Sequence, residues 1–109
     1  NAGSWAQLGA DIDGAGVKDG AGTSVCISSN GQIVAIGSPE LNTNNKGEVR
    51  VFQFIAGVWT QIGADIHGRA AGDHSGISVS LSSDGQIVAS GAIMNGGKGY
   101  VTVHSFGNV

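Results

Sequence analysis

Four side chains of kinds that bind transition metals lie within one ten-residue window of this chain. They are Asp65, His67, Asp73 and His74. Imidazole and carboxylate groups are ordinary zinc ligands, but a zinc site needs them to converge on one point. The stretch 54 residues earlier repeats the aspartates and lacks both histidines. We therefore expect the aspartates of both stretches to accept backbone N–H bonds in glycine-rich loops, and we predict no metal site.

Serine, histidine and aspartate, the components of a hydrolytic triad, all occur in this chain. No Gly-x-Ser-x-Gly motif at a junction between a strand and a helix accompanies them. Residues 96–99 read Gly-Gly-Lys-Gly, but a phosphate-binding loop needs a longer spacing and a following helix. We predict no catalytic residue, no cofactor-binding residue and no cofactor, and hence a protein that is not an enzyme.

An internal repeat defines the elements that would have to position such groups. Residues 5–37 and 59–91 are identical at 19 of 33 positions when they are aligned with a shift of 54 residues. Each copy opens with the pattern Trp-x-Gln-x-Gly-Ala-Asp-Ile, at Trp5 and at Trp59. A period near this length is typical of solenoids, propellers and other repeat arrays.

Alternating apolar residues, separated by glycine-containing turns, divide each copy into strands. The predicted strands are 4–12, 23–29, 32–37, 48–55, 58–66, 77–83, 86–91 and 99–106. Asn30-Gly31, Ala56-Gly57 and Asp84-Gly85 predict turns, and for Asn30-Gly31 we expect a two-residue hairpin turn. The nearly all-apolar strand 32–37 should lie inside a sheet with both faces covered.

No stretch shows helical periodicity, so we predict an all-β protein. Four short antiparallel strands per repeat, joined as a meander, match the blade of a β-propeller. An immunoglobulin-like sandwich is the structural alternative, but it does not repeat every 54 residues. Residues 1–109 then form a single two-repeat module, with blade one at 23–66 and blade two at 77–106.

Blade two lacks its fourth strand, and residues 4–12 are a copy of that strand at the other end of the sequence. We predict that residues 4–12 pair with blade two of a neighbouring subunit and so cover the free edge of strand 99–106. The predicted interface residues are Trp5, Gln7, Leu8, Ala10, Ile12, Val101 and Val103. Such a head-to-tail contact closes into a ring or continues as a filament. Alternatively, the chain is a fragment of a longer propeller.

Composition excludes several classes of partner. The net charge is −3, and the five Lys and Arg residues form no basic stripe, so we expect no nucleic acid. No apolar run approaches the roughly 20 residues of a membrane span, so we expect no membrane insertion. The single cysteine, Cys26, has Ser80 as its repeat equivalent, which favours a small buried or half-buried side chain over an intermolecular disulfide or a reactive thiol.

Three short motifs of the first copy resemble the FG-GAP repeat of integrin-α-like β-propellers. They are Gly22-Thr23-Ser24-Val25, Val34-Ala35-Ile36-Gly37-Ser38-Pro39 and Gly47-Glu48-Val49-Arg50-Val51-Phe52, and the second copy carries weaker forms of them. The resemblance implies an extracellular or cell-surface propeller used for adhesion, recognition or scaffolding. Ala21 and Ser75 replace the family's Phe, and the calcium loop is reduced to Ser29-Asn30-Gly31 and Ser83-Asp84-Gly85. We therefore expect no calcium.

Together these observations predict an extracellular structural or adhesive protein that assembles with itself. The alternative is a glycan-binding module. For that function, recognition would fall on the polar loops 38–46 and 92–98, because loops on a rigid scaffold commonly carry binding residues. The candidate ligand residues are Asn42, Asn44, Asn45 and Asn95. Trp5 and Trp59 could stack on sugar rings, but their equivalent positions favour packing on their own blades.

Overall fold

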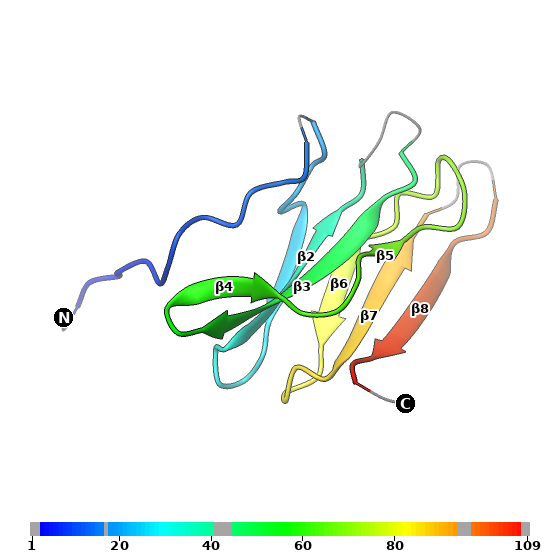
Figure 1. Ribbon diagram of the computed structural model, residues 1–109. Helices are drawn as coiled ribbons and strands as arrows, with labels where there is room; N and C mark the ends of the chain where they lie inside the picture. The colour runs from blue at the N-terminus through cyan, green and yellow to red at the C-terminus, as the bar shows by residue number, and fades with distance from the viewer. Residues whose placement is uncertain (1–2, 17, 41–44, 94–96, 108–109) are drawn as a thin grey trace.

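The computed structural model describes residues 3–16, 18–40, 45–93 and 97–107, and no helix occurs among them. Their strands form two antiparallel sheets that pack against each other (Figure 1). Sheet one contains β1 (Ser24–Ile27), β2 (Ile33–Ser38), β3 (Glu48–Ile55), β4 (Val58–Gln61) and β5 (Ile66–His67). Sheet two contains β6 (Ser78–Leu81), β7 (Ile87–Ala92) and β8 (Tyr100–Ser105). The prediction of an all-β fold is confirmed.

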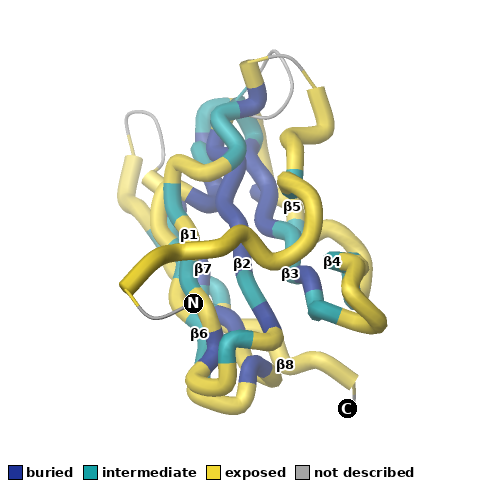
Figure 2. The backbone as a smooth tube through the Cα atoms, turned by 90° about the vertical axis from the view of Figure 1, so that its left-hand side faces the viewer, coloured by how far each residue is buried: buried dark blue, intermediate teal, exposed yellow. Residues whose placement is uncertain are grey.

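Both sheets are meanders. Sheet one has the order β1-β2-β3-β4, with β5 also pairing with β3, and sheet two has the order β6-β7-β8. The observed strands overlap the predicted ones throughout residues 23–106. β2 lies between β1 and β3 and is the most deeply buried strand, which confirms the prediction for its apolar sequence (Figure 2).

The hydrogen-bond register shows which positions of the two repeats are equivalent. Ser38 pairs with Glu48 in sheet one, as Ala92 pairs with Tyr100 in sheet two. Equivalent residues are therefore 54 positions apart as far as Ala92, but 52 apart in β3 and β8, because the second connecting loop is shorter. We call such residues counterparts.

The predicted strand 58–66 is interrupted. β4 and β5 both pair with β3, but residues 62–65 form a bulge between them. The Ile62 N–H still donates to the Val51 carbonyl at 2.9 Å, after which Gly63 adopts a φ of 76° that turns the chain out of the ladder. Glycine reaches such a φ without steric cost, which is why the strand bulges there.

The Asn30-Gly31 turn is wider than the two-residue turn predicted for it. Ser28 N–H donates to Ile33 O, and Gly31 N–H donates to Ser28 O, so the loop has four residues. The Asn30 side chain accepts a bond from the Gln32 N–H, and this Asx-type contact favours the wider loop.

Ala56-Gly57 is the true two-residue turn. Its flanking residues Ile55 and Val58 pair, and both turn residues have positive φ. The strands on either side of this turn are β3 and β4.

The two sheets bury a small shared interior. Ala35 and Val49 of sheet one meet Val88 of sheet two. The partly buried side chains around these three are Val51, Ile66, Val79 and Leu81. Cys26 is half-buried at this contact and accepts the Leu81 N–H at 3.2 Å, which agrees with its predicted role as a small filler.

Residues 4–12 form no strand within this single chain, and their predicted pairing with a neighbouring subunit stays a prediction. They extend away from the body along the side of sheet one, far from β8 (Figure 1). No strand of the described residues pairs with them. Trp5, the first large apolar residue of the segment, is 102% exposed.

Candidate functional site

Exposed apolar side chains gather on two faces of the molecule. Val25 and Ile27 of β1 are 62% and 58% exposed, and Val101 and Val103 of β8 are 68% and 64% exposed. In the repeat, the counterparts of the first pair are Val79 and Leu81, and those of the second pair are Val49 and Val51. All four counterparts belong to the interior between the two sheets. Each outer face therefore carries one half of the contact that the chain already makes internally.

The free edge of β8 is the second part of this surface. β3, the counterpart of β8, is flanked by β2 on one side and by β4 and β5 on the other. β8 pairs only with β7 among the described strands. Its other edge presents unpaired backbone donors and acceptors, which favour the addition of a further strand.

Residues 7–11 repeat two local features of their counterparts, residues 61–65. The Gln7 side chain donates to Asp11 at 2.8 Å, as Gln61 donates to Asp65 at 2.6 Å. Gly9 has a φ of 70°, close to the 76° of its counterpart Gly63. The segment therefore shares this hydrogen bond and this glycine conformation with the bulge at 62–65.

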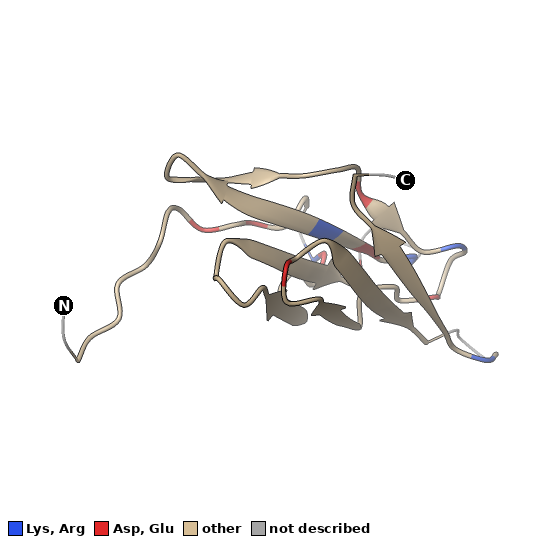
Figure 3. Ribbon diagram, turned by 90° about the horizontal axis from the view of Figure 1, so that it is seen from below, with Lys and Arg blue, Asp and Glu red and all other residues tan. Residues whose placement is uncertain are grey.

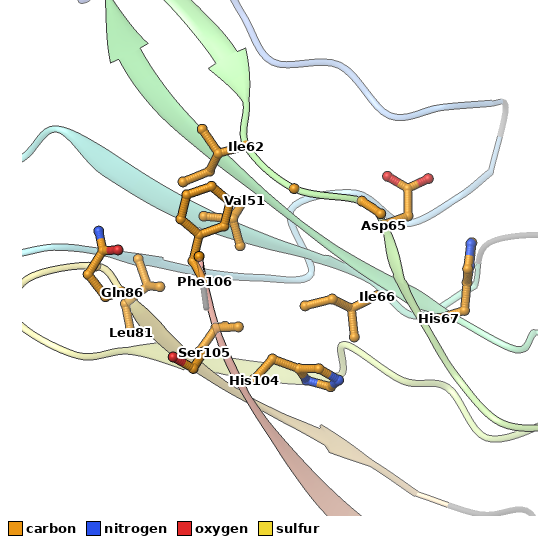
Figure 4. A pocket seen from close by; sticks show the side chains of 15 residues that line it. Val51, Ile62, Asp65, Ile66, His67, Leu81, Gln86, His104, Ser105 and Phe106 are labelled. Carbon is orange, nitrogen blue, oxygen red and sulfur yellow. The ribbon is translucent and has the colours of Figure 1, made fainter. Parts of the chain in front are cut away.

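Two counterpart grooves lie beside the two copies of this bulge. The larger groove, of about 420 Å³, lies between residues 62–67 and the end of β8 (Figure 4). Phe106 stands beside Ile62 and Val51 at one end of it, and Asp65 and His67 lie toward the other end (Figure 4). The smaller groove, of about 270 Å³, lies between residues 10–13 and β3, and Trp59 is part of its wall.

Glu48, Asp65 and His67 are brought together by the bulge. Their potential ligand atoms lie within 4.8 Å of one another. Glu48 is 1% exposed, and its oxygens lie 3.4 Å from Arg50 Nε and 3.5 Å from His67 Nδ1. Burial, and then the Asp65 charge, raise the pKa of Glu48 to about 7, while Arg50 opposes the shift. Because the guanidinium already occupies the position beside Glu48, we interpret the cluster as a buried polar cluster at the bulge.

Of the four predicted metal-type residues, the structure keeps Asp65 and His67 together and places the other two elsewhere. Asp73 accepts the Tyr100 hydroxyl at 2.6 Å and the Ala70 N–H at 3.0 Å. The Tyr100 bond is the main reason why the pKa of Asp73 is lowered. Its counterpart Asp19 accepts the Gly16 N–H in the same way. The structural role predicted for these two aspartates is confirmed.

Of the four asparagines predicted as ligand residues, the structure describes Asn45 alone. Asn45 is half-buried and its carbonyl accepts the His74 N–H, whereas Asn42, Asn44 and Asn95 lie outside the described residues. The polar loops proposed for recognition lie partly outside them too. Charged side chains are scattered over the described chain, without a basic stripe (Figure 3).

Among the predicted interface residues, all those of the N-terminal segment are exposed except the partly buried Ile12. The sequence prediction missed Val25 and Ile27, although comparing each with its counterpart in the second copy could have found them. It also missed Glu48, for which the sequence carries no signal, because the bulge that brings Asp65 to it cannot be recognised from the repeat.

No protein-family model, no curated protein and no solved structure matches this chain. The resemblance to the FG-GAP repeat stays a prediction. Within the described residues there is also no helix with the length and apolarity needed to cross a membrane.

Proposed function

We propose that this chain is a non-enzymatic structural or adhesive repeat protein that associates head-to-tail with further copies of itself. Sheet two of one copy packs on sheet one of the next, and residues 4–12 of the second copy pair with β8 of the first. The result is a ring or a filament of propeller-type blades. Its FG-GAP-like motifs favour an extracellular or cell-surface location.

The observation that carries this proposal is the complementarity of the two exposed faces. Val101 and Val103 stand where Val49 and Val51 stand in sheet one, and Val49 is fully buried by sheet two. A second copy that docked Val25 and Ile27 onto this face would repeat a contact whose geometry the chain already contains. Because the two faces differ, the contact is heterologous and propagates from copy to copy.

Side-chain burial alone leaves the strength of this association open. Full burial of a valine or isoleucine contributes about 1.5–3 kcal/mol, and joining two chains costs roughly 4–15 kcal/mol. The four exposed side chains are therefore comparable to that cost. The donated strand must supply the surplus through its ladder and its own side chains.

Light scattering across a micromolar concentration series tests the proposal. We expect particles larger than one chain, either a discrete oligomer for a ring or a polydisperse series for a filament. Deletion of residues 1–12 should return the chain to a monomer.

A second variant tests the exposed valine face of β8 and leaves the donated strand, residues 4–12, unchanged. Val101→Thr together with Val103→Thr keeps β-branched side chains at positions that are exposed in the free chain, and should weaken association without unfolding it. Ile55→Thr is the matched control, because Ile55 is exposed and its counterpart is Gly107, outside the proposed contact. A wild-type chain that stays monomeric throughout the series would contradict the proposal.

A further inference from the structure

Trp59, which forms part of the wall of the smaller groove, packs against the N-terminal segment of its own chain. Its indole N–H donates to the Leu8 carbonyl at 2.9 Å, and its ring centroid lies 4.9 Å from that of Phe54. A Cβ on Gly9 would lie 3.0 Å from both rings, so the absence of a side chain there lets the indole cover the segment. The Trp59 side chain therefore packs over residues 8 and 9 and holds them against β4, the outer strand of sheet one.

The second repeat has every part of this arrangement except the tryptophan. Ile62, Gly63 and Phe106 are the counterparts of Leu8, Gly9 and Phe54. A Cβ on Gly63 would lie 3.4 Å from the Phe106 ring, which repeats the approach of Gly9 to Phe54. Beside these residues lies the larger groove, and Figure 4 shows Phe106 and Ile62 adjacent in its wall.

We infer that this groove is the receptor for Trp5 of a second copy. Trp5 is the counterpart of Trp59, and it is fully exposed, with no described part of its own chain covering it. The inference rests on the proposed head-to-tail association and names its anchor. The indole N–H of the second copy's Trp5 would donate to the Ile62 carbonyl, and its ring would pack on Phe106 over Gly63.

The repeat also sets the register of the donated strand. Phe54 pairs with Trp59, and Phe52 pairs with Gln61, in sheet one. The corresponding pairs between copies are Phe106 with Trp5 and His104 with Gln7. Further along, Val49 pairs with Ile66, which places Ile12 opposite Val101.

Variants at Trp5 test the inference with little risk to the fold, because the side chain is fully exposed in the free chain. Trp5→Ala should weaken association by at least about tenfold, as expected of a buried aromatic anchor. The association strength of Trp5→Phe should lie between those of the wild type and Trp5→Ala, since phenylalanine keeps a ring and loses the N–H donor. Ala6→Thr is the matched control, because it creates the residue found at the counterpart Thr60, and should associate like the wild type.

Tryptophan fluorescence gives an independent measurement. In Trp59→Phe, Trp5 is the sole indole, and its quenching by acrylamide should fall several-fold when the chain associates. If Trp59→Phe does not fold, the difference in quenching between the wild type and Trp5→Phe reports the same side chain. Association that proceeds with Trp5 fully quenchable, and equally well in Trp5→Ala, would overturn the inference and leave the proposed function standing. A wild-type chain that stays monomeric to about 1 mM would overturn both.

Discussion

At the scale of single residues, Glu48 is a buried side chain whose charge state depends on folding. Its pKa of about 7 lies above the ordinary value of 4.5, so the folded state favours the protonated carboxyl. The groups around it are Asp65, Asp19, Arg50 and His67. The stability that this preference contributes is complete below pH 4.5 and is lost as the pH rises to about 7.

Glu48→Gln should remove this pH dependence, because an amide keeps the shape of the protonated carboxyl and cannot ionise. Each pKa unit corresponds to about 1.4 kcal/mol, so the wild type should lose on the order of 2–3 kcal/mol across the window relative to the variant. Urea unfolding at pH 4.5 and at pH 8 measures the difference. Glu40→Gln, at an exposed glutamate, is the control. Parallel pH curves for the wild type and Glu48→Gln would show that the carboxyl is not held in its protonated form.

At the scale of elements, the Ala56-Gly57 turn is built on two residues with positive φ, of 50° and 84°. This is the geometry of a type I′ turn, in which asparagine is much better tolerated than alanine. Ala56→Asn should stabilise the fold by about 0.5–1 kcal/mol and raise the melting temperature by a few degrees.

The second turn position gives the converse test. Gly57→Ala should destabilise the fold by about 1 kcal/mol. A Cβ there meets nothing within 4 Å, so the loss is a backbone effect, and Gly57→Asn should cost less. Thermal unfolding followed by circular dichroism distinguishes the two. Equal losses for Ala and Asn would argue against a left-handed backbone at this position.

The sequence predicted the strands better than the irregular segments between them. Alternation places the strands correctly because a half-buried strand needs one apolar face, as in β6, where Val79 and Leu81 are partly buried. In β1 the alternating Val25 and Ile27 are exposed instead. The bulge at 62–65 escaped prediction because it depends on Gly63 leaving the ladder, whereas Gly37 and Gly91 stay within β2 and β7. Without the bulge, the contact of Asp65 with Glu48 could not be foreseen either.

The N-terminal segment illustrates a different limit. Its side-chain pattern predicts a strand, and it shares the Gln–Asp hydrogen bond and the positive glycine φ of its counterpart at 61–65. It nevertheless pairs with no described strand of its own chain. A repeat reveals that a strand is out of place, but only the register of both sheets shows which residues it would meet.

At the scale of the whole molecule, Gly37 of β2 lies directly against Gly76, just before β6. A Cβ on Gly37 would overlap the carbonyl oxygen of Gly76 and the hydroxyl of Ser24. Backbone cannot move aside as a side chain can, so Gly37→Ala should destabilise the fold by about 2–3 kcal/mol. Chemical denaturation measures this loss, and a variant as stable as the wild type would mean that the sheets do not meet here.

Gly91 is the counterpart of Gly37, and it separates folding from association. In the free chain its Cβ would meet only the Ser78 hydroxyl, at 2.7 Å, and that side chain can rotate away. In the proposed assembly, however, Gly91 faces the Gly22 carbonyl of the next copy, since Gly22 is the counterpart of Gly76. The free energy of unfolding of Gly91→Ala should therefore lie within about 1 kcal/mol of the wild-type value. In light scattering, however, the variant should remain a monomer at concentrations where the wild type associates. Association of Gly91→Ala at wild-type strength would show that copies do not stack as the two sheets of one chain do.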